Sequence, residues 1–180
     1  MAEEIFRNYQ RLLNKVDEFS SRIINKYRKY INCGYGCSGC CQQNLNLLPL
    51  EYSFLWEGFA LLPEPIKKSV PNRTAQRFGD YTSCLLLDQG ACLLYERRPI
   101  ICRTHGLPLF IMEGDKARRD CCPKNFISYR LEFLPQTDFL DLERLNTILI
   151  TINRFFASLT GIDAGIRLAL NNLPDGNIIF

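Results

Sequence analysis

Four of the protein's nine cysteines lie within one nine-residue stretch, CGYGCSGCC, at positions 33 to 41. The other five follow at wider spacing along the chain. Thiolates are soft ligands, and closely grouped thiolates are typical of sites for zinc, copper(I) or iron–sulfur clusters. The cysteines that we predict as metal ligands are Cys33, Cys37, Cys40, Cys41, Cys84, Cys92, Cys102, Cys121 and Cys122.

The N-terminal sequence, MAEEIFRNYQ, lacks the basic start and the apolar run of roughly 7–15 residues that a secretory signal needs. No apolar run approaches the ~20 residues that span a bilayer. We therefore expect a cytoplasmic protein with no membrane partner, in which dense cysteines indicate metal ligation rather than disulfides. The net charge of +3 is small and the basic residues form no concentrated stripe, so we expect no nucleic-acid partner.

The two adjacent pairs, Cys40–Cys41 and Cys121–Cys122, are harder to place on one metal ion. Neighbouring side chains of an extended backbone point to opposite sides, so either a pair faces two metals or only one member is a ligand. Known spacings do not explain the pattern. The C-x3-C-x2-C triad of radical SAM enzymes is present, but this chain is too short for their barrel. Zinc ribbons need a second C-x2-C pair, and bacterial ferredoxins need C-x2-C-x2-C-x3-C-P.

Other polar residues lie close to these cysteines in the sequence. His105, the only histidine, follows Cys102 by three residues and is either a further ligand or a polar residue with a hydrogen-bond partner. Arg98 and Arg103 are either hydrogen-bond donors to thiolates or ordinary surface or capping residues. Tyr95 is predicted to pack in the core.

Helices are expected at both ends of the chain. The apolar spacing over residues 5 to 31 predicts one long amphipathic helix that ends at Cys33-Gly34 and packs its stripe in the core. A helix over Pro49–Leu61 precedes a turn-rich connector. A helix over residues 142 to 159 ends at Gly161, and Asp163 caps another that reaches Leu170. The N-terminal stripe comprises Phe6, Tyr9, Leu13, Val16, Ile23, Tyr27 and Tyr30, and the connector prolines are Pro63, Pro65 and Pro71.

The middle of the chain is expected to be irregular, with little β-structure. Residues 83 to 95 predict a β-hairpin around Asp88-Gln89-Gly90, which would hold Cys84 and Cys92 close together. Residues 107 to 120 predict a second short hairpin. The fold class is therefore mainly α: one helical domain, 1–180, with an N-terminal helix over 1–32, an irregular cysteine-rich, metal-binding core over 33–123 and C-terminal helices over 124–180.

CGYGCSGCC, followed by CLLLDQGACLLYERRPIICRTHG and then CCP, resembles the cysteine-cluster proteins known as zinc- or iron-chelating domains. That family is named for a C-x2-C-x2-C-C motif, from which this chain departs by having three residues between its first two cysteines. The resemblance covers about residues 33 to 123 and implies a metal site of eight cysteines, the last being Cys121 or Cys122. The second family signature is matched by Cys84, Cys92, Tyr95-Glu96, Arg98-Pro99 and Cys102-Arg103.

Our first hypothesis is a metal-binding protein whose cysteines chelate zinc or iron, the latter for instance as a [4Fe-4S] cluster. The ligands suit two metal centres, or one cluster with further thiols around it. A second hypothesis is an iron–sulfur enzyme, because a related branch of the family contains flagellin lysine methylases with a similar cluster. A third is a structural-zinc interaction module, in which the N-terminal helix binds a protein partner or a second copy of the chain.

Overall fold

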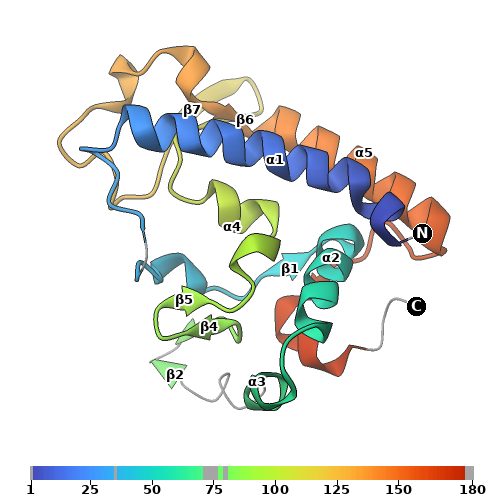
Figure 1. Ribbon diagram of the computed structural model, residues 1–180. Coiled ribbons are helices and arrows are strands. Elements are labelled where there is room, and N and C mark those ends of the chain that lie inside the picture. Colours follow the sequence, from blue (N-terminus) through green and yellow to red (C-terminus); the bar gives the residue numbers. More distant parts are fainter. Residues whose placement is uncertain (1, 35, 71–76, 79–80, 177–180) are drawn as a thin grey trace. The chain divides into compact units, whose positions relative to one another are not determined.

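The computed structural model describes residues 2–34, 36–70, 77–78 and 81–176 and is mainly helical, with a few very short strands (Figure 1). Its contacts divide the chain into two compact units. Unit 1 comprises Met1–Phe6, Tyr35–Pro99 and Asn153–Phe180, and unit 2 comprises Arg7–Gly34 and Ile100–Ile152. Helices α1 (Ala2–Lys26) and α5 (Leu142–Thr160) each contribute residues to both units.

Helix α1 confirms the predicted N-terminal helix and its apolar stripe. Six of the seven stripe residues are buried, with Tyr9 and Ile23 fully inaccessible to solvent, so the stripe packs within the chain. The predicted end at Cys33-Gly34 was wrong: the helix ends at Lys26, and a turn closed by a hydrogen bond from Tyr30 N to Tyr27 O (2.8 Å) follows. The rings of Tyr30 and Tyr129 lie 4.7 Å apart, and this aromatic packing favours the turn over further helix.

The core of unit 1 is built around α2 (Pro49–Ala60), which confirms the predicted second helix. Proline at the first helical position lacks the N–H that would otherwise need a partner. The side-chain oxygen of Asn153 accepts the next N–H, from Leu50 (3.1 Å), while its amide nitrogen donates to Ala164 O (3.0 Å). Asn153 therefore caps α2 from a distant segment of the chain.

The expected turn-rich connector contains a short helix. Helix α3 (Glu64–Ser69) begins directly after Pro63 and has Pro65 in its first turn, where proline is well tolerated. Pro71, the third proline assigned to the connector, lies outside the described residues.

Unit 1 also contains three two-stranded antiparallel sheets. One of them confirms the predicted first hairpin: β4 (Leu87–Asp88) pairs with β5 (Ala91–Cys92) through a two-residue turn. Gln89 (φ 46°) and Gly90 (φ 82°) both adopt positive φ, as a type I′ hairpin turn requires. The other two sheets pair β2 (Arg77–Phe78) with β3 (Tyr81–Thr82) and β1 (Asn46–Leu47) with β9 (Leu168–Ala169).

The helix predicted to run from Asp163 to Leu170 was wrong. Asp163 Oδ1 accepts the N–H of Gly165 (2.8 Å), which closes a local turn instead of capping a helix. The chain then pairs with β1 as β9 and continues as the 3-10 helix η6 (Leu170–Asp175). Pairing with a distant strand outweighs the local capping signal here.

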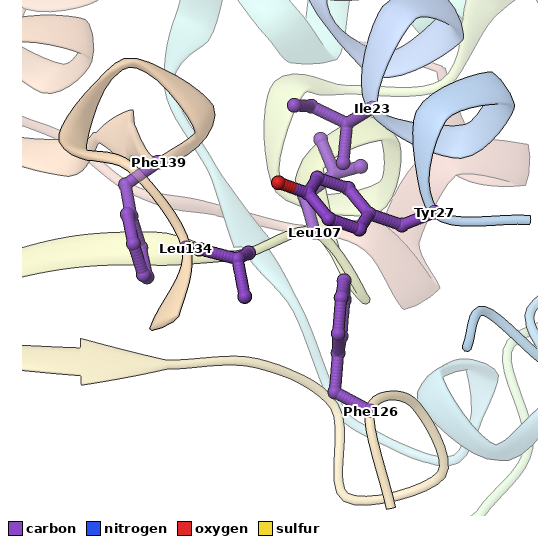
Figure 2. Packing of buried hydrophobic residues seen from close by; sticks show 6 residues of the cluster. All are labelled: Ile23, Tyr27, Leu107, Phe126, Leu134 and Phe139. Carbon is purple, nitrogen blue, oxygen red and sulfur yellow. The ribbon is translucent and has the colours of Figure 1, made fainter. Parts of the chain in front are cut away.

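Unit 2 contains the second predicted hairpin, which is confirmed. Strand β6 (Leu109–Glu113) pairs with β7 (Lys116–Asp120), and β8 (Leu140–Asp141) adds in parallel to the other edge of β6. Figure 2 shows the buried cluster of this unit, in which Ile23 of α1 and Tyr27, the residue directly after this helix, face side chains from three later segments. The cluster comprises Ile23, Tyr27, Leu107, Phe126, Leu134 and Phe139.

The predicted C-terminal helix is confirmed as α5. Its bounds match the expectation closely, and Gly161 (φ 76°) follows its last residue in the left-handed conformation that commonly ends a helix. Asp141 begins the helix by accepting the N–H of Arg144 (3.0 Å), a side-chain cap that satisfies one exposed donor of the first turn.

A buried carboxylate, Asp138, joins α1 to the segment before β8 within unit 2. Only 1% of Asp138 is exposed, and it accepts hydrogen bonds from Arg22 (2.6 Å), Lys26 (2.5 Å) and the Tyr27 hydroxyl (2.5 Å). Burial by itself raises the pKa of Asp138, but these three donors outweigh it and lower the pKa to about 2. The carboxylate is therefore ionised and fully paired at neutral pH.

Among the helices of the described residues, none combines the length and the apolar character needed to cross a membrane.

Candidate functional site

All nine cysteines lie in the described part of the chain, each as a partly exposed thiol outside any disulfide. The two units divide them into two sets. Unit 1 holds Cys37, Cys40, Cys41, Cys84 and Cys92, and unit 2 holds Cys33, Cys102, Cys121 and Cys122. Each set includes at least the four thiols of a tetrahedral zinc site.

The cysteine loop, residues 33 to 41, ends within unit 1 in a 3-10 helix, η1 (Gly39–Cys41). The side chains of Cys40 and Cys41 are hydrogen-bonded to each other, so the two thiols meet. We expected the side chains of adjacent cysteines to point to opposite sides, as they do in extended backbone. This was wrong for Cys40 and Cys41, because η1 is helical. The same hydrogen bond, together with burial, raises the pKa of Cys40 far above its ordinary value.

The first hairpin approaches this loop at two places. The N–H of Cys84 donates to the carbonyl oxygen of Cys41 (2.6 Å). At the hairpin turn, a Cβ added to Gly90 would lie 3.4 Å from the Cα of Gly36, so two glycines allow the two backbones to come close together. The cysteine loop and the hairpin are therefore neighbours within unit 1.

The thiols of Cys84 and Cys92 lie within electrostatic range of each other and of Cys40. They are not cross-strand partners, because Cys84 precedes β4 and Cys92 pairs with Leu87. Burial raises the pKa of Cys84 to about 11 and also raises the pKa of Cys92. Without a cation, these thiols are therefore protonated at neutral pH.

Arg98 lies within electrostatic range of two of these thiols, Cys40 and Cys92. Its positive charge lowers the pKa of both Cys40 and Cys92 against the larger effects that raise them, so it favours their thiolate forms. Its guanidinium covers the ring of Tyr95 at 3.5 Å and donates to the Tyr95 carbonyl oxygen (2.8 Å). The prediction that Tyr95 packs in the core was wrong, because 55% of it is exposed and its ring supports Arg98 at the surface.

In unit 2, the buried amide of Asn125 holds Cys33 in place. Its nitrogen donates to Cys33 Sγ (3.2 Å) and to the Gly106 carbonyl oxygen (2.7 Å). Its oxygen accepts the N–H groups of Asn32 (2.8 Å) and Cys33 (3.2 Å). One side chain thus joins the start of the cysteine loop to two segments that follow it by more than 70 residues.

The second adjacent pair lies next to this amide. Cys121 is within electrostatic range of Cys122 and Cys33, and its Sγ lies 3.9 Å from the carbonyl oxygen of Asn125. Burial, and then the negative charge of Asp120, raise the pKa of Cys121 to about 11. Cys121 also packs against the buried cluster of unit 2. Cys33 and Cys121 therefore both lie beside Asn125, and Cys122 directly follows Cys121.

The remaining candidates of unit 2 surround helix α4 (Ile100–Thr104). Cys102 lies on this helix, and His105 follows it as an exposed residue whose N–H donates to the Ile101 carbonyl oxygen (3.2 Å). Arg103 forms an ion pair with Asp17 of α1, which anchors α4 within the unit.

In residues 2–34, 36–70, 77–78 and 81–176, no three His, Cys, Asp or Glu side chains converge tightly enough to hold a metal ion. The donor types nevertheless suit zinc or an iron–sulfur cluster, since each set consists of soft sulfur ligands. The sequence did not point to Asn125, because nothing in its neighbourhood marks an amide whose partners lie so far away. Gly106 carries a weak sequence signal, since glycine is common just after a helix and this one lies two residues after α4.

We expect Gly106→Ala to destabilise the metal-free protein by about 2 kcal/mol, measured by urea unfolding. Gly106 has φ +97°, and its added Cβ would lie 2.8 Å from Cys33 Sγ and 3.1 Å from the Asn125 amide nitrogen. Gly34→Ala is the matched control, because its Cβ would meet nothing within 4 Å, and it should be neutral or slightly stabilising. Equal unfolding midpoints for the two variants would contradict this account of the turn.

Comparison with protein-family models, with curated proteins and with solved structures finds no match to this chain.

Proposed function

We propose that this protein binds zinc or iron through its cysteine thiolates and belongs to the zinc- or iron-chelating cysteine-cluster proteins that its motifs resemble. The observation that carries the proposal is the gathering of thiols from segments far apart in the sequence. In unit 1, Cys40 and Cys41 meet each other and neighbour Cys84, whose N–H binds the Cys41 carbonyl oxygen. In unit 2, the Asn125 amide donates to Cys33 Sγ (3.2 Å), and the Asn125 carbonyl oxygen lies 3.9 Å from Cys121 Sγ.

The electrostatics of the thiols indicate what a bound cation would change. Burial disfavours an isolated thiolate, so the pKa of Cys84 and that of Cys121 are both raised to about 11. A bound metal ion reverses this balance, because its positive charge stabilises the deprotonated ligand directly. Arg98 would add to the stabilisation in unit 1 and Asn125 would donate to the Cys33 sulfur in unit 2.

The choice of metal determines the kind of protein this is. Zinc has no redox chemistry and, with four thiolates, would act as a structural clasp between loops. An iron–sulfur cluster would supply redox or substrate-binding chemistry, tuned by hydrogen bonds to sulfur such as that from Asn125. Both metals use the same thiolates, so the proposal concerns the ligands first.

The experiment is metal analysis and acid-labile sulfide analysis of the full chain purified without oxygen, with its visible spectrum recorded. We expect zinc in whole-number stoichiometry in a colourless sample, or iron with sulfide and a brown colour. Protein that carries neither metal, and whose nine cysteines all react rapidly with a thiol reagent, would overturn the proposal.

A further inference from the structure

One turn of unit 2 buries an apolar side chain and exposes the next one. Phe126 has a positive φ (54°), which is unusual for a bulky residue, and its N–H donates to the Tyr30 carbonyl oxygen (2.7 Å). Its ring points into the buried cluster beside Tyr27 (Figure 2). The N–H of Tyr129 donates to the Phe126 carbonyl oxygen (3.1 Å), which closes a tight turn with Ile127 near its tip. Ile127 is 77% exposed, although such turns favour polar residues, glycine and proline.

The next turn exposes a second large apolar residue. Phe133 ends the 3-10 helix η4 (Leu131–Phe133) and is 69% exposed. The ring centroid of Tyr129 lies 6.5 Å from that of Phe133 and 4.7 Å from that of Tyr30. Tyr30 and Tyr129 are half-buried, so a row of three aromatic rings leads outward to Phe133. Ile127 and Phe133 are the two most exposed large apolar residues in the described part of unit 2.

The two segments that form this surface are basic. They cover residues 21–34 and 121–131, and they are joined by a hydrogen bond from the Asn32 amide to the Lys124 carbonyl oxygen (2.6 Å). Together they contain six Lys or Arg and neither Asp nor Glu. Two of the six cations pair with Asp138. The other four are exposed: Arg28, Lys29, Lys124 and Arg130.

The acids that flank the second segment do not neutralise all of this charge. Asp120 pairs with Arg118 (2.6 Å), and Glu132 pairs with Arg130 (3.4 Å). Among the described residues, Arg28, Lys29 and Lys124 take part in no ion pair. Positive charge without a partner in these segments therefore accompanies the two exposed apolar side chains.

We propose that Ile127, Phe133, Arg28, Lys29 and Lys124 form a surface that binds the face of an anionic phospholipid bilayer. A bilayer accepts apolar side chains that protrude from turns without a matching pocket, whereas a protein partner needs one. Each Lys or Arg close to an anionic membrane adds about fivefold to the affinity. The expectation of no membrane partner rested on the absence of a bilayer-spanning run, and binding at the surface requires none.

The test is cosedimentation of the reduced full chain with vesicles of phosphatidylserine and phosphatidylcholine, and with vesicles of phosphatidylcholine alone. We expect binding to the mixed vesicles only. Ile127→Ser with Phe133→Ser should weaken this binding by about tenfold or more, because both apolar groups then stay in water. Lys29→Gln with Lys124→Gln should also weaken it by about tenfold or more. Leu61→Ser is the matched control, because Leu61 is 79% exposed but belongs to unit 1, and it should bind like the wild type.

The proposal is overturned if the wild-type chain does not bind the mixed vesicles, or binds both kinds of vesicle equally. Equal binding by the wild type and the Ile127→Ser, Phe133→Ser variant would also overturn it. Binding to a labelled single-stranded oligonucleotide instead of vesicles would assign the surface to nucleic acid. If the apolar variant does not fold, the Lys29→Gln, Lys124→Gln variant still decides, because both of its side chains are exposed. None of these results depends on the metal content of the protein.

Discussion

Removing the bound metal with a strong chelator should lower the free energy of unfolding by about 4 kcal/mol or more. The thiols of unit 1 lie in or beside segments with little regular hydrogen bonding: η1 has three residues, and β4 and β5 have two each. Metal–thiolate bonds would be the strongest links between these segments. Urea unfolding of the reduced protein, with and without chelator, measures the difference.

The control for this prediction is a chain that lacks four of the proposed ligands. The variant with Cys84, Cys92, Cys121 and Cys122 all replaced by serine should unfold at the lower midpoint and should not respond to chelator. A wild-type midpoint that is the same with and without metal would contradict a stabilising role for the thiolates.

Replacing Asp138 by asparagine should destabilise the protein by about 3 kcal/mol at neutral pH. The change removes the charge that Arg22 and Lys26 share and weakens the acceptor of the buried Tyr27 hydroxyl. This loss of unfolding free energy is at the lower end for a buried ion pair because the Arg22 and Lys26 side chains are about half exposed, at 47% and 48%. Chemical denaturation of the two proteins under identical metal conditions measures the loss.

The same pair of proteins has a defined pH dependence. The pKa of Asp138 is lowered in the folded protein to about 2, whereas an unfolded aspartate has a pKa near ~3.9. Its contribution is therefore complete above about pH 4 and is lost as the pH falls towards 2. The difference in unfolding free energy between wild type and Asp138→Asn should be constant above that range and shrink within it.

A matched control for Asp138 is Glu18→Gln, on the same helix. Glu18 pairs with Lys15 at 2.9 Å, but both side chains are mostly exposed, and such pairs contribute little. We expect a change below about 0.5 kcal/mol. A similar loss for both variants would mean that the burial of Asp138 has no special energetic effect.

Local patterns in the sequence were sufficient for the regular elements. A proline suited to the first helical turn predicted α2, and the spacing of apolar residues predicted α5, both nearly to the residue. The Gln89-Gly90 turn identified the first hairpin, because such a turn is determined by its own two residues. Predictions failed where distant contacts decide the conformation. Helix α1 ends early beside Tyr129, and Asp163 closes a turn next to a strand that pairs with β1.

In the candidate site, too, local sequence predicts one part and distant contacts decide the other. The types and spacing of the cysteines named the ligands to consider, but their assignment to two units depends on tertiary contacts. Cys33 is only four residues from Cys37, yet it belongs to unit 2 because its partners are Gly106 and Asn125. Sequence proximity therefore does not reveal which thiols lie in the same unit.

X-ray absorption at the edge of the bound metal, on protein purified without oxygen, tests the central claim most directly. Thiolate ligation predicts a first shell dominated by sulfur, at ~2.3 Å for zinc. That shell should lose sulfur and gain oxygen or nitrogen when Cys84 and Cys92 are replaced by serine. A first shell of oxygen and nitrogen alone in the wild-type protein would contradict the account.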